Sequence, residues 1–151
     1  MNLFGVMEVS GSALKAERIR AEVVAANMAN AETTRTPEGG PYRRQHVVFS
    51  SAAAEPNSFA GQLMSQADPE SNPQIGGVQV SAVVQDPVST LRRYDPSHPD
   101  ADKDGYVSYP DINPLTEMVD LMGATRAYGL NSSAVQATKG MINSSLDILK
   151  S

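Results

Sequence analysis

The chain of 151 residues contains no cysteine and no tryptophan, and it has only five tyrosines and three phenylalanines. The absence of cysteine excludes disulfides, thiolate catalysis and sulfur-ligated metals. Leu, Ile, Val and Phe account for 31 of the 151 residues, close to the level of about 20% below which chains tend toward disorder. We therefore expect one elongated domain with a small core that gains much of its order from partners.

Long apolar runs and basic clusters are also missing. No run approaches the roughly 18 apolar residues of a spanning helix, and the first positive residue is Lys15, so the basic start of a secretory signal is absent. The formal net charge is -5. We interpret the pairs Arg43-Arg44 and Arg92-Arg93 as solvated loop or strand-edge charges, and we expect no nucleic-acid partner. Any export from the cytoplasm would need another route.

Proline is absent from both ends of the chain, because all ten prolines lie between Pro37 and Pro114. This distribution predicts three parts: an N-terminal helix within residues 1–36, an irregular middle at 37–112 and a C-terminal helix within 113–151. Valine-rich strands are expected at Tyr42–Phe49 and Gly77–Gln85, and shorter strands at Leu91–Tyr94 and Gly105–Tyr109. A mobile loop is expected around 50–76. The fold class is α+β, with two long terminal helices and a small β-rich, loop-rich middle.

The C-terminal segment carries a strict heptad repeat at Leu121, Tyr128, Val135, Ile142 and Leu149. Such a repeat keeps one apolar seam facing a partner helix. The residues three positions earlier begin at Met118 but are polar in the middle of the helix, so a partner of mixed character is expected. Another apolar line, which includes Met141, lies away from the seam. Because one partner cannot cover both faces, we expect contacts with further subunits.

Asn113 or Thr116 could cap the start of the C-terminal helix, and Glu117 and Asp120 in its first turn favour the helix dipole.

The N-terminal segment also carries an apolar stripe at seven-residue intervals: Met7, Leu14, Ala21 and Met28. The simplest alternative is that the two helices pair inside one globular domain. Two-faced helices at both ends favour assembly instead.

An acidic segment from Asp100 to Asp111 fits the EF-hand calcium loop, with Asp100, Asp102, Asp104 and Asp111 at ligand positions. Prolines on both flanks exclude the helices that such a loop needs, so we interpret it as an acidic turn between strands. His46 and His98 have no companion at ligand spacing, and no Gly-rich phosphate loop follows a strand. We therefore predict no catalytic site, metal, cofactor or small-molecule substrate.

Two terminal motifs resemble the signatures of the bacterial flagellar rod and hook axial proteins. The N-terminal motif runs from Ala13 to Arg18 and on to Asn27-Met28-Ala29-Asn30-Ala31-Glu32-Thr33, and the C-terminal one from Asn113 to Met122 and on to Arg126-Ala127-Tyr128 and Asn131. Two further segments, Gly40–Arg44 and Tyr94–Val107, are similar to a proximal-rod member of that family. The resemblance covers nearly the whole chain, least well at 50–76.

The resemblance implies a structural subunit of the proximal rod in the flagellar basal body. Its terminal helices would pair as an antiparallel, coiled-coil-like inner layer of a helical tube, with the seam residues and Asn27, Asn30 and Asn131 at assembly interfaces. The implied partners are copies of itself, other rod subunits, the flagellar type III export apparatus and basal-body ring components. The alternative function is a calcium-responsive adaptor that uses the same helices to bind a target.

Overall fold

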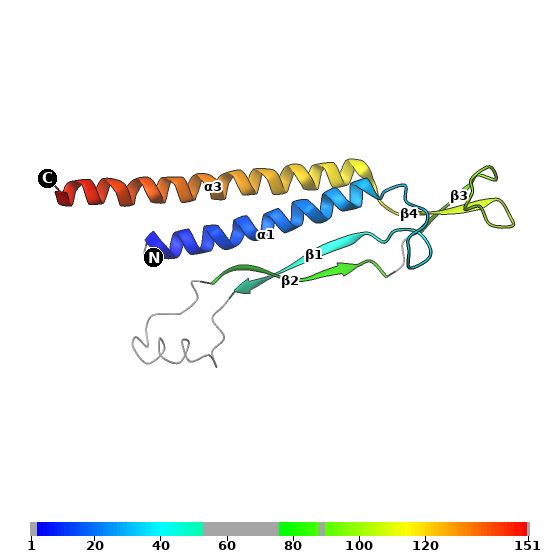
Figure 1. The fold of residues 1–151 in the computed structure, drawn as a ribbon, viewed down its shortest axis with the longest axis horizontal. Coiled ribbons are helices and arrows are strands. Elements are labelled where there is room, and N and C mark those ends of the chain that lie inside the picture. The colour runs from blue at the N-terminus through cyan, green and yellow to red at the C-terminus, as the bar shows by residue number, and fades with distance from the viewer. Residues whose placement is uncertain (1–2, 53–75, 88–89, 151) are drawn as a thin grey trace, which may run out of the picture. The chain divides into compact units, whose positions relative to one another are not determined.

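The computed structural model describes residues 3–52, 76–87 and 90–150. The elements follow in the order α1 (Leu3–Ala29), β1 (Gln45–Ala52), β2 (Gly77–Gln85), β3 (Thr90–Tyr94), β4 (Tyr106–Pro110) and α3 (Pro114–Lys150) (Figure 1). The predicted α+β class with two terminal helices is confirmed. Most of the loop expected around 50–76 lies outside the described residues.

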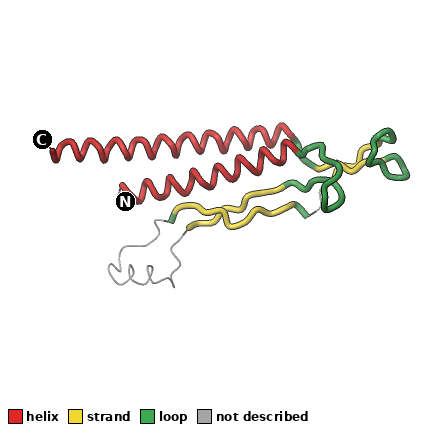
Figure 2. The backbone as a smooth tube through the Cα atoms, viewed as in Figure 1, coloured by secondary structure: helices red, strands yellow, loops and turns green. Residues whose placement is uncertain are grey.

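The chain divides into two compact units. One unit contains residues 1–18, 49–81 and 125–151, and the other contains residues 19–48 and 82–124. Both units take in parts of α1, α3, β1 and β2, while the β3–β4 pair belongs entirely to the second unit. Figure 2 shows the helices and strands in separate colours.

The start of α3 has the cap expected from the sequence. The side-chain Oδ1 of Asn113 accepts a hydrogen bond from the Leu115 N–H at 3.0 Å, and its carbonyl accepts the Glu117 N–H at 3.1 Å. Pro114 occupies the first helical position, where its missing N–H costs nothing. Asn113, and not Thr116, is therefore the N-cap.

In the second unit, α1 and α3 run antiparallel. Arg20 pairs with Asp120 at 3.3 Å, and Asn27 donates to Glu117 at 3.1 Å. Moving forward along α1 thus moves backward along α3. α1 itself ends at Ala29, and the Asn30 amide donates back to the Ala26 carbonyl at 2.9 Å before the chain turns toward Pro37.

The four strands form two separate two-stranded sheets, β1 with β2 and β3 with β4. β3 and β4 are antiparallel, with Arg93 opposite Val107 and Tyr94 opposite Tyr106. Gly105 supplies the positive φ of 79° in the connecting turn. The predicted strands are confirmed within one residue, except that β1 runs from Gln45 to Ala52 instead of from Tyr42 to Phe49. The difference arises because Tyr42 and Arg44 turn toward the helices.

The core of the described residues is small, as the composition predicted. Its buried apolar residues are mostly short: Ala16, Val24, Val107, Ile112 and Ala124. The fully or nearly fully buried polar residues are almost as numerous: Ser10, Asn27, Glu117 and Thr138. With so little apolar surface enclosed within the chain, hydrophobic stabilisation from folding alone is modest.

Gly77 allows the start of β2 to approach α1 closely. The Ser12 hydroxyl donates to the Val9 carbonyl at 2.7 Å and accepts the Val78 N–H at 3.0 Å. A Cβ on residue 77 would lie 2.0 Å from Ser12 Oγ and 2.8 Å from its Cβ.

We therefore expect Gly77→Ala to push β2 away from α1 and to lower the free energy of unfolding by about 1–3 kcal/mol. Gly11→Ala is the matched control, because a Cβ there meets nothing within 4 Å and replacing a helical glycine by alanine stabilises by roughly 0.5–1 kcal/mol. Urea denaturation of both variants measures the two opposite changes. Equal stability of Gly77→Ala and the parent would refute the close approach.

Candidate assembly surface

α3 presents a row of large apolar side chains to solvent, here called the α3 outer row. In the second unit the row contains Leu115, Met118, Val119 and Met122, and in the first unit it contains Leu130, Met141 and Ile148. Leu130 is 67% exposed. Single exposed apolar residues are normal, but a set recurring at helical spacing marks a contact surface.

The opposite side of α3 is covered. Glu117, Ala124 and Thr138 are buried at seven-residue multiples, and the predicted heptad seam lies beside them, with Leu121, Val135 and Ile142 half-buried. The residues that are buried together with the seam are therefore Glu117, Ala124 and Thr138. The line that begins at Met118, three positions before the seam, starts with an exposed residue. α3 is two-faced, as the sequence indicated.

The predicted interface residues fall into three groups, and their role in assembly stays a prediction. Asn27 is buried. The half-buried positions are Met7, Leu14, Ala21, Met28, Asn30, Leu121, Asn131, Val135 and Ile142. The exposed positions are Met118, Tyr128, Met141 and Leu149.

A buried polar cluster joins α1, the start of β1 and α3 in the second unit, and we call it the polar latch. Its centre is Glu117, whose side chain is 1% exposed. Glu117 Oε1 accepts a hydrogen bond from Arg44 Nε at 2.6 Å and forms an ion pair with Arg44 Nη2 at 2.5 Å. Arg44 also approaches Asp120 at 3.8 Å. The buried carboxylate is thereby neutralised by a guanidinium, as a charge removed from water requires.

Asn27 completes the latch from α1. Its Nδ2 donates to the Gln45 carbonyl at 2.9 Å and to Glu117 Oε2 at 3.1 Å. Its Oδ1 accepts the Gln45 N–H at 2.9 Å and the Tyr42 hydroxyl at 3.2 Å. All the hydrogen-bonding capacity of this amide is used. Burial, and then the charge of Glu117, raise the pKa of Tyr42, so the hydroxyl keeps the proton that it donates.

Sequence reasoning missed most of this latch. The interpretation of Arg44 as a solvated charge is wrong, because its guanidinium pairs with a buried carboxylate and its side chain is 25% exposed. Glu117 was assigned only to the helix dipole. Its neighbours along the chain gave no signal of burial, whereas its place in the motif from Asn113 to Met122 could have marked it.

The first part of the EF-hand-like segment, Asp100 to Gly105, belongs to the turn between β3 and β4, and the rest is β4 itself followed by Asp111. Asp102 Oδ1 accepts the N–H groups of Asp104 and Tyr106, both at 2.9 Å, and its Oδ2 accepts Arg92 at 2.6 Å. Asp100 accepts the Thr34 hydroxyl at 2.8 Å and lies 3.8 Å from Arg35. These carboxylates hold the turn and its neighbours. Within the described ranges, no three His, Asp or Glu side chains gather to hold a metal ion.

We expect Asp100, Asp102 and Asp104 to be replaceable together by Asn with little effect on assembly with other subunits, because the amide oxygens still accept the same N–H groups. The Tyr106 N–H, followed by other hydrogen bonds, lowers the pKa of Asp102. Its ionised form therefore contributes stability above the ordinary pKa, and this contribution is lost as the pH falls through the folded-state pKa. Thermal unfolding with calcium and with a chelator checks the assignment. A calcium-dependent rise of the unfolding temperature in the parent, and not in the triple variant, would contradict the assignment of this segment as a turn without bound metal.

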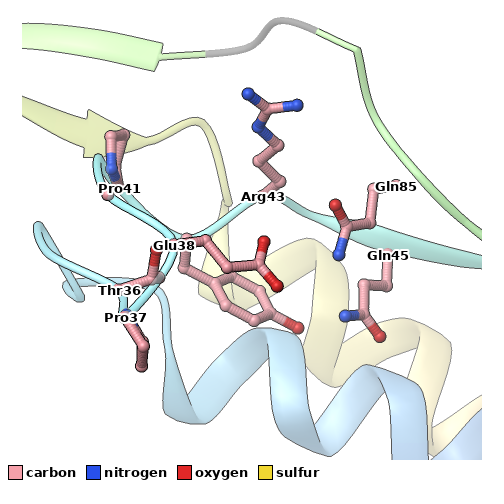
Figure 3. Close-up of a pocket in the computed structure, with 9 residues that line it drawn as sticks. Thr36, Pro37, Glu38, Pro41, Arg43, Gln45 and Gln85 are labelled. Atoms are coloured by element: carbon pink, nitrogen blue, oxygen red, sulfur yellow. The ribbon is translucent and has the colours of Figure 1, made fainter.

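The second unit also has an open pocket of about 370 Å³ beside the turn at Gly39 and Gly40 (Figure 3). Glu38, Gln45 and Gln85 bring polar groups to it, and Arg43 lies above Glu38 in the view with its guanidinium pointing upward. The other lining residues are Thr36, Pro37, Gly39, Pro41 and Tyr42. Among the described residues that line it there is no Ser, Cys or His. No described helix is long and apolar enough to cross a membrane.

Comparison with known proteins identifies the family. Residues 7–35 match the flagella basal body rod protein model, and residues 103–148 match the flagellar basal body rod FlgEFG protein C-terminal model. The chain is 43% identical to the flagellar basal-body rod protein FlgC of Bacillus subtilis, over 99% of this chain and 100% of that protein. It is 40% identical to FlgC of Borreliella burgdorferi over 99% of both. The chain belongs to the FlgC family.

Membership covers almost the full length, since FlgC of Salmonella typhimurium is also 33% identical over 98% of both chains. This FlgC-family chain is accordingly a structural subunit of the flagellar basal-body rod, where it assembles with other rod subunits. The resemblance read from the terminal motifs is confirmed. Nothing in the described residues supports the calcium-responsive alternative, because Asp100 and Asp102 are engaged within the chain.

Proposed function

We propose that this FlgC-family subunit polymerises in the proximal rod through its terminal helices, with the α3 outer row as the principal contact surface. The observation that carries the proposal is the exposure of seven large apolar side chains on one side of α3. The opposite side of the same helix, which carries the seam and Glu117 of the polar latch, packs within the chain. The exposed side is therefore left for a neighbouring subunit.

Burial of this row against neighbours is favourable. Each fully buried large apolar side chain contributes roughly 1.5–3 kcal/mol relative to exposure in water. Neighbour contacts between two different surfaces of the subunit do not close on themselves and generate an open helical tube. The small core within the chain leaves a large share of the available hydrophobic stabilisation to such contacts.

The remaining parts of the proposal follow from the family. Residues 1–36 and 113–151 form the inner layer of the tube, and residues 37–112 form the β-rich outer part. The subunit has no catalytic activity. It reaches the rod through the flagellar type III export apparatus and also contacts ring components of the basal body.

Leu130→Asp tests the contact surface. The change places a charge where a neighbour should pack, and an unpaired buried charge costs several kcal/mol. Cells carrying it should produce and export the protein at normal levels but lack rods and motility. The matched control is Gln136→Asp, at an exposed polar position of the same helix, which should leave motility intact. Normal motility with Leu130→Asp would exclude the α3 outer row as the surface.

A further inference from the structure

The polar latch lies where three segments distant in sequence meet, and its two buried members, Asn27 and Glu117, are each about 1% exposed. Asn27 binds the backbone of Gln45 on one side and the Glu117 carboxylate on the other. Arg44 then closes the group on Glu117. Every member therefore depends on the other segments being in place.

The apolar contacts between the two helices would be similar in more than one register, whereas the contacts of the polar latch form in one register only. The stripe of α1 repeats every seven residues from Met7 to Met28, and the seam of α3 repeats every seven residues from Leu121 to Leu149. A slide of α3 by seven residues would keep apolar residues opposite apolar residues. The buried apolar residues of the two helices in the second unit are short, Val24 and Ala124, and such side chains discriminate weakly between these arrangements.

The same slide would disrupt the latch completely. Ala124 would take the place of Glu117, so Asn27 would lose its carboxylate partner and Arg44 would face a methyl group. An unpaired buried amide and an unpaired guanidinium are both costly. A buried polar group that fixes the register of paired helices is the best-attested use of such groups.

We propose that the polar latch of Asn27, Arg44 and Glu117 specifies the register of α1 against α3. The chain segment through Tyr42 and Gln45 takes part, because it supplies the hydroxyl and the backbone groups that fix the Asn27 amide. The inference rests on the proposed function only for its consequence, since the register decides which side chains of α3 are left for neighbours. The register itself is a property of the single subunit.

The absence of cysteine makes a direct test possible in the isolated full-length protein. Spin labels are attached to Ala25→Cys and Thr116→Cys, two exposed positions of α1 and α3 in the second unit. The distance between the labels is measured by pulsed electron spin resonance. The parent should give one narrow distance distribution, and a label pair at Ala25 and Ala29 within α1 serves as the reference for a fixed separation.

The decisive variant replaces the latch by apolar residues of similar size, Asn27→Leu, Arg44→Met and Glu117→Leu together. This leaves no unpaired charge, so the protein is expected to fold. The distance distribution should gain a second population. A slide of seven residues, at roughly 1.5 Å each, moves the label on α3 by about 10 Å along the helix axis. A single distribution identical to that of the parent would overturn the proposal.

Two further variants keep the proposal falsifiable if the triple variant does not fold. Glu117→Gln retains an oxygen for the Asn27 amide and should keep the parent distance. Asn27→Ala removes the contacts to Gln45, Tyr42 and Glu117 and should broaden the distribution, whereas an unchanged narrow distribution would refute the role of the latch. These measurements need no rod, so failure of Leu130→Asp to block motility would leave them unaffected.

Discussion

Replacing Arg44 by Met should lower the free energy of unfolding by about 3–5 kcal/mol, the usual cost of removing one partner of a buried ion pair. The cost arises because the Glu117 carboxylate would stay enclosed, at 1% exposure, after losing its hydrogen bond and its ion pair with the guanidinium. Chemical denaturation followed by circular dichroism measures the change, and a protein of marginal stability would unfold altogether.

The adjacent arginine provides the control for this prediction. Arg43 is exposed. Arg43→Met therefore removes the same positive charge from the same segment but leaves the ion pair of Glu117 intact. Surface substitutions of this kind usually change stability by no more than about 0.5 kcal/mol. If both methionine variants lose the same small amount, the ion pair with Glu117 makes no special contribution.

Tyr128→Asp should block rod assembly even though the protein is made and exported. Tyr128 lies in the heptad seam between Leu121 and Val135 and is 44% exposed in the single subunit, so its remaining surface is available to a neighbouring subunit. An unpaired charge enclosed there would cost several kcal/mol at each of many repeated contacts. Electron microscopy of basal bodies and a motility assay measure the effect.

The same Gln136→Asp control applies, because Gln136 is an exposed polar residue two turns further along α3. Motile cells with Tyr128→Asp would mean that this part of the seam faces water in the rod. The α3 outer row would then be the contact surface without help from the seam.

The sequence predicted the secondary structure well because its signals are local. The distribution of prolines, the heptads of α3 and the Asn113-Pro114 start depend on neighbouring residues alone. Both helices and three of the four strands appear where the local signals place them, whereas β1 lies three residues further along the chain. The turn at Asp102 and Gly105 was also predictable, since an Asp side chain accepts nearby backbone N–H groups and Gly adopts the positive φ that the turn needs.

The polar latch could not be predicted in the same way. Asn27 and Glu117 are 90 residues apart in sequence, and no periodicity links Arg44 to either of them. Arginine next to arginine in a loop is usually solvated, so only the packing of three segments reveals that Arg44 points inward and Arg43 outward. The close approach of Gly77 to Ser12 depends on tertiary structure for the same reason.

Photo-cross-linking in assembled rods tests most directly whether the α3 outer row joins neighbouring subunits. Benzoylphenylalanine is introduced at Met141, an exposed member of the row, and at Gln136 as the control, in cells shown to remain motile. Irradiated basal bodies should yield cross-links from position 141 to another rod subunit or to a second copy of this chain. Cross-links from position 136 with none from position 141 would contradict the proposed surface.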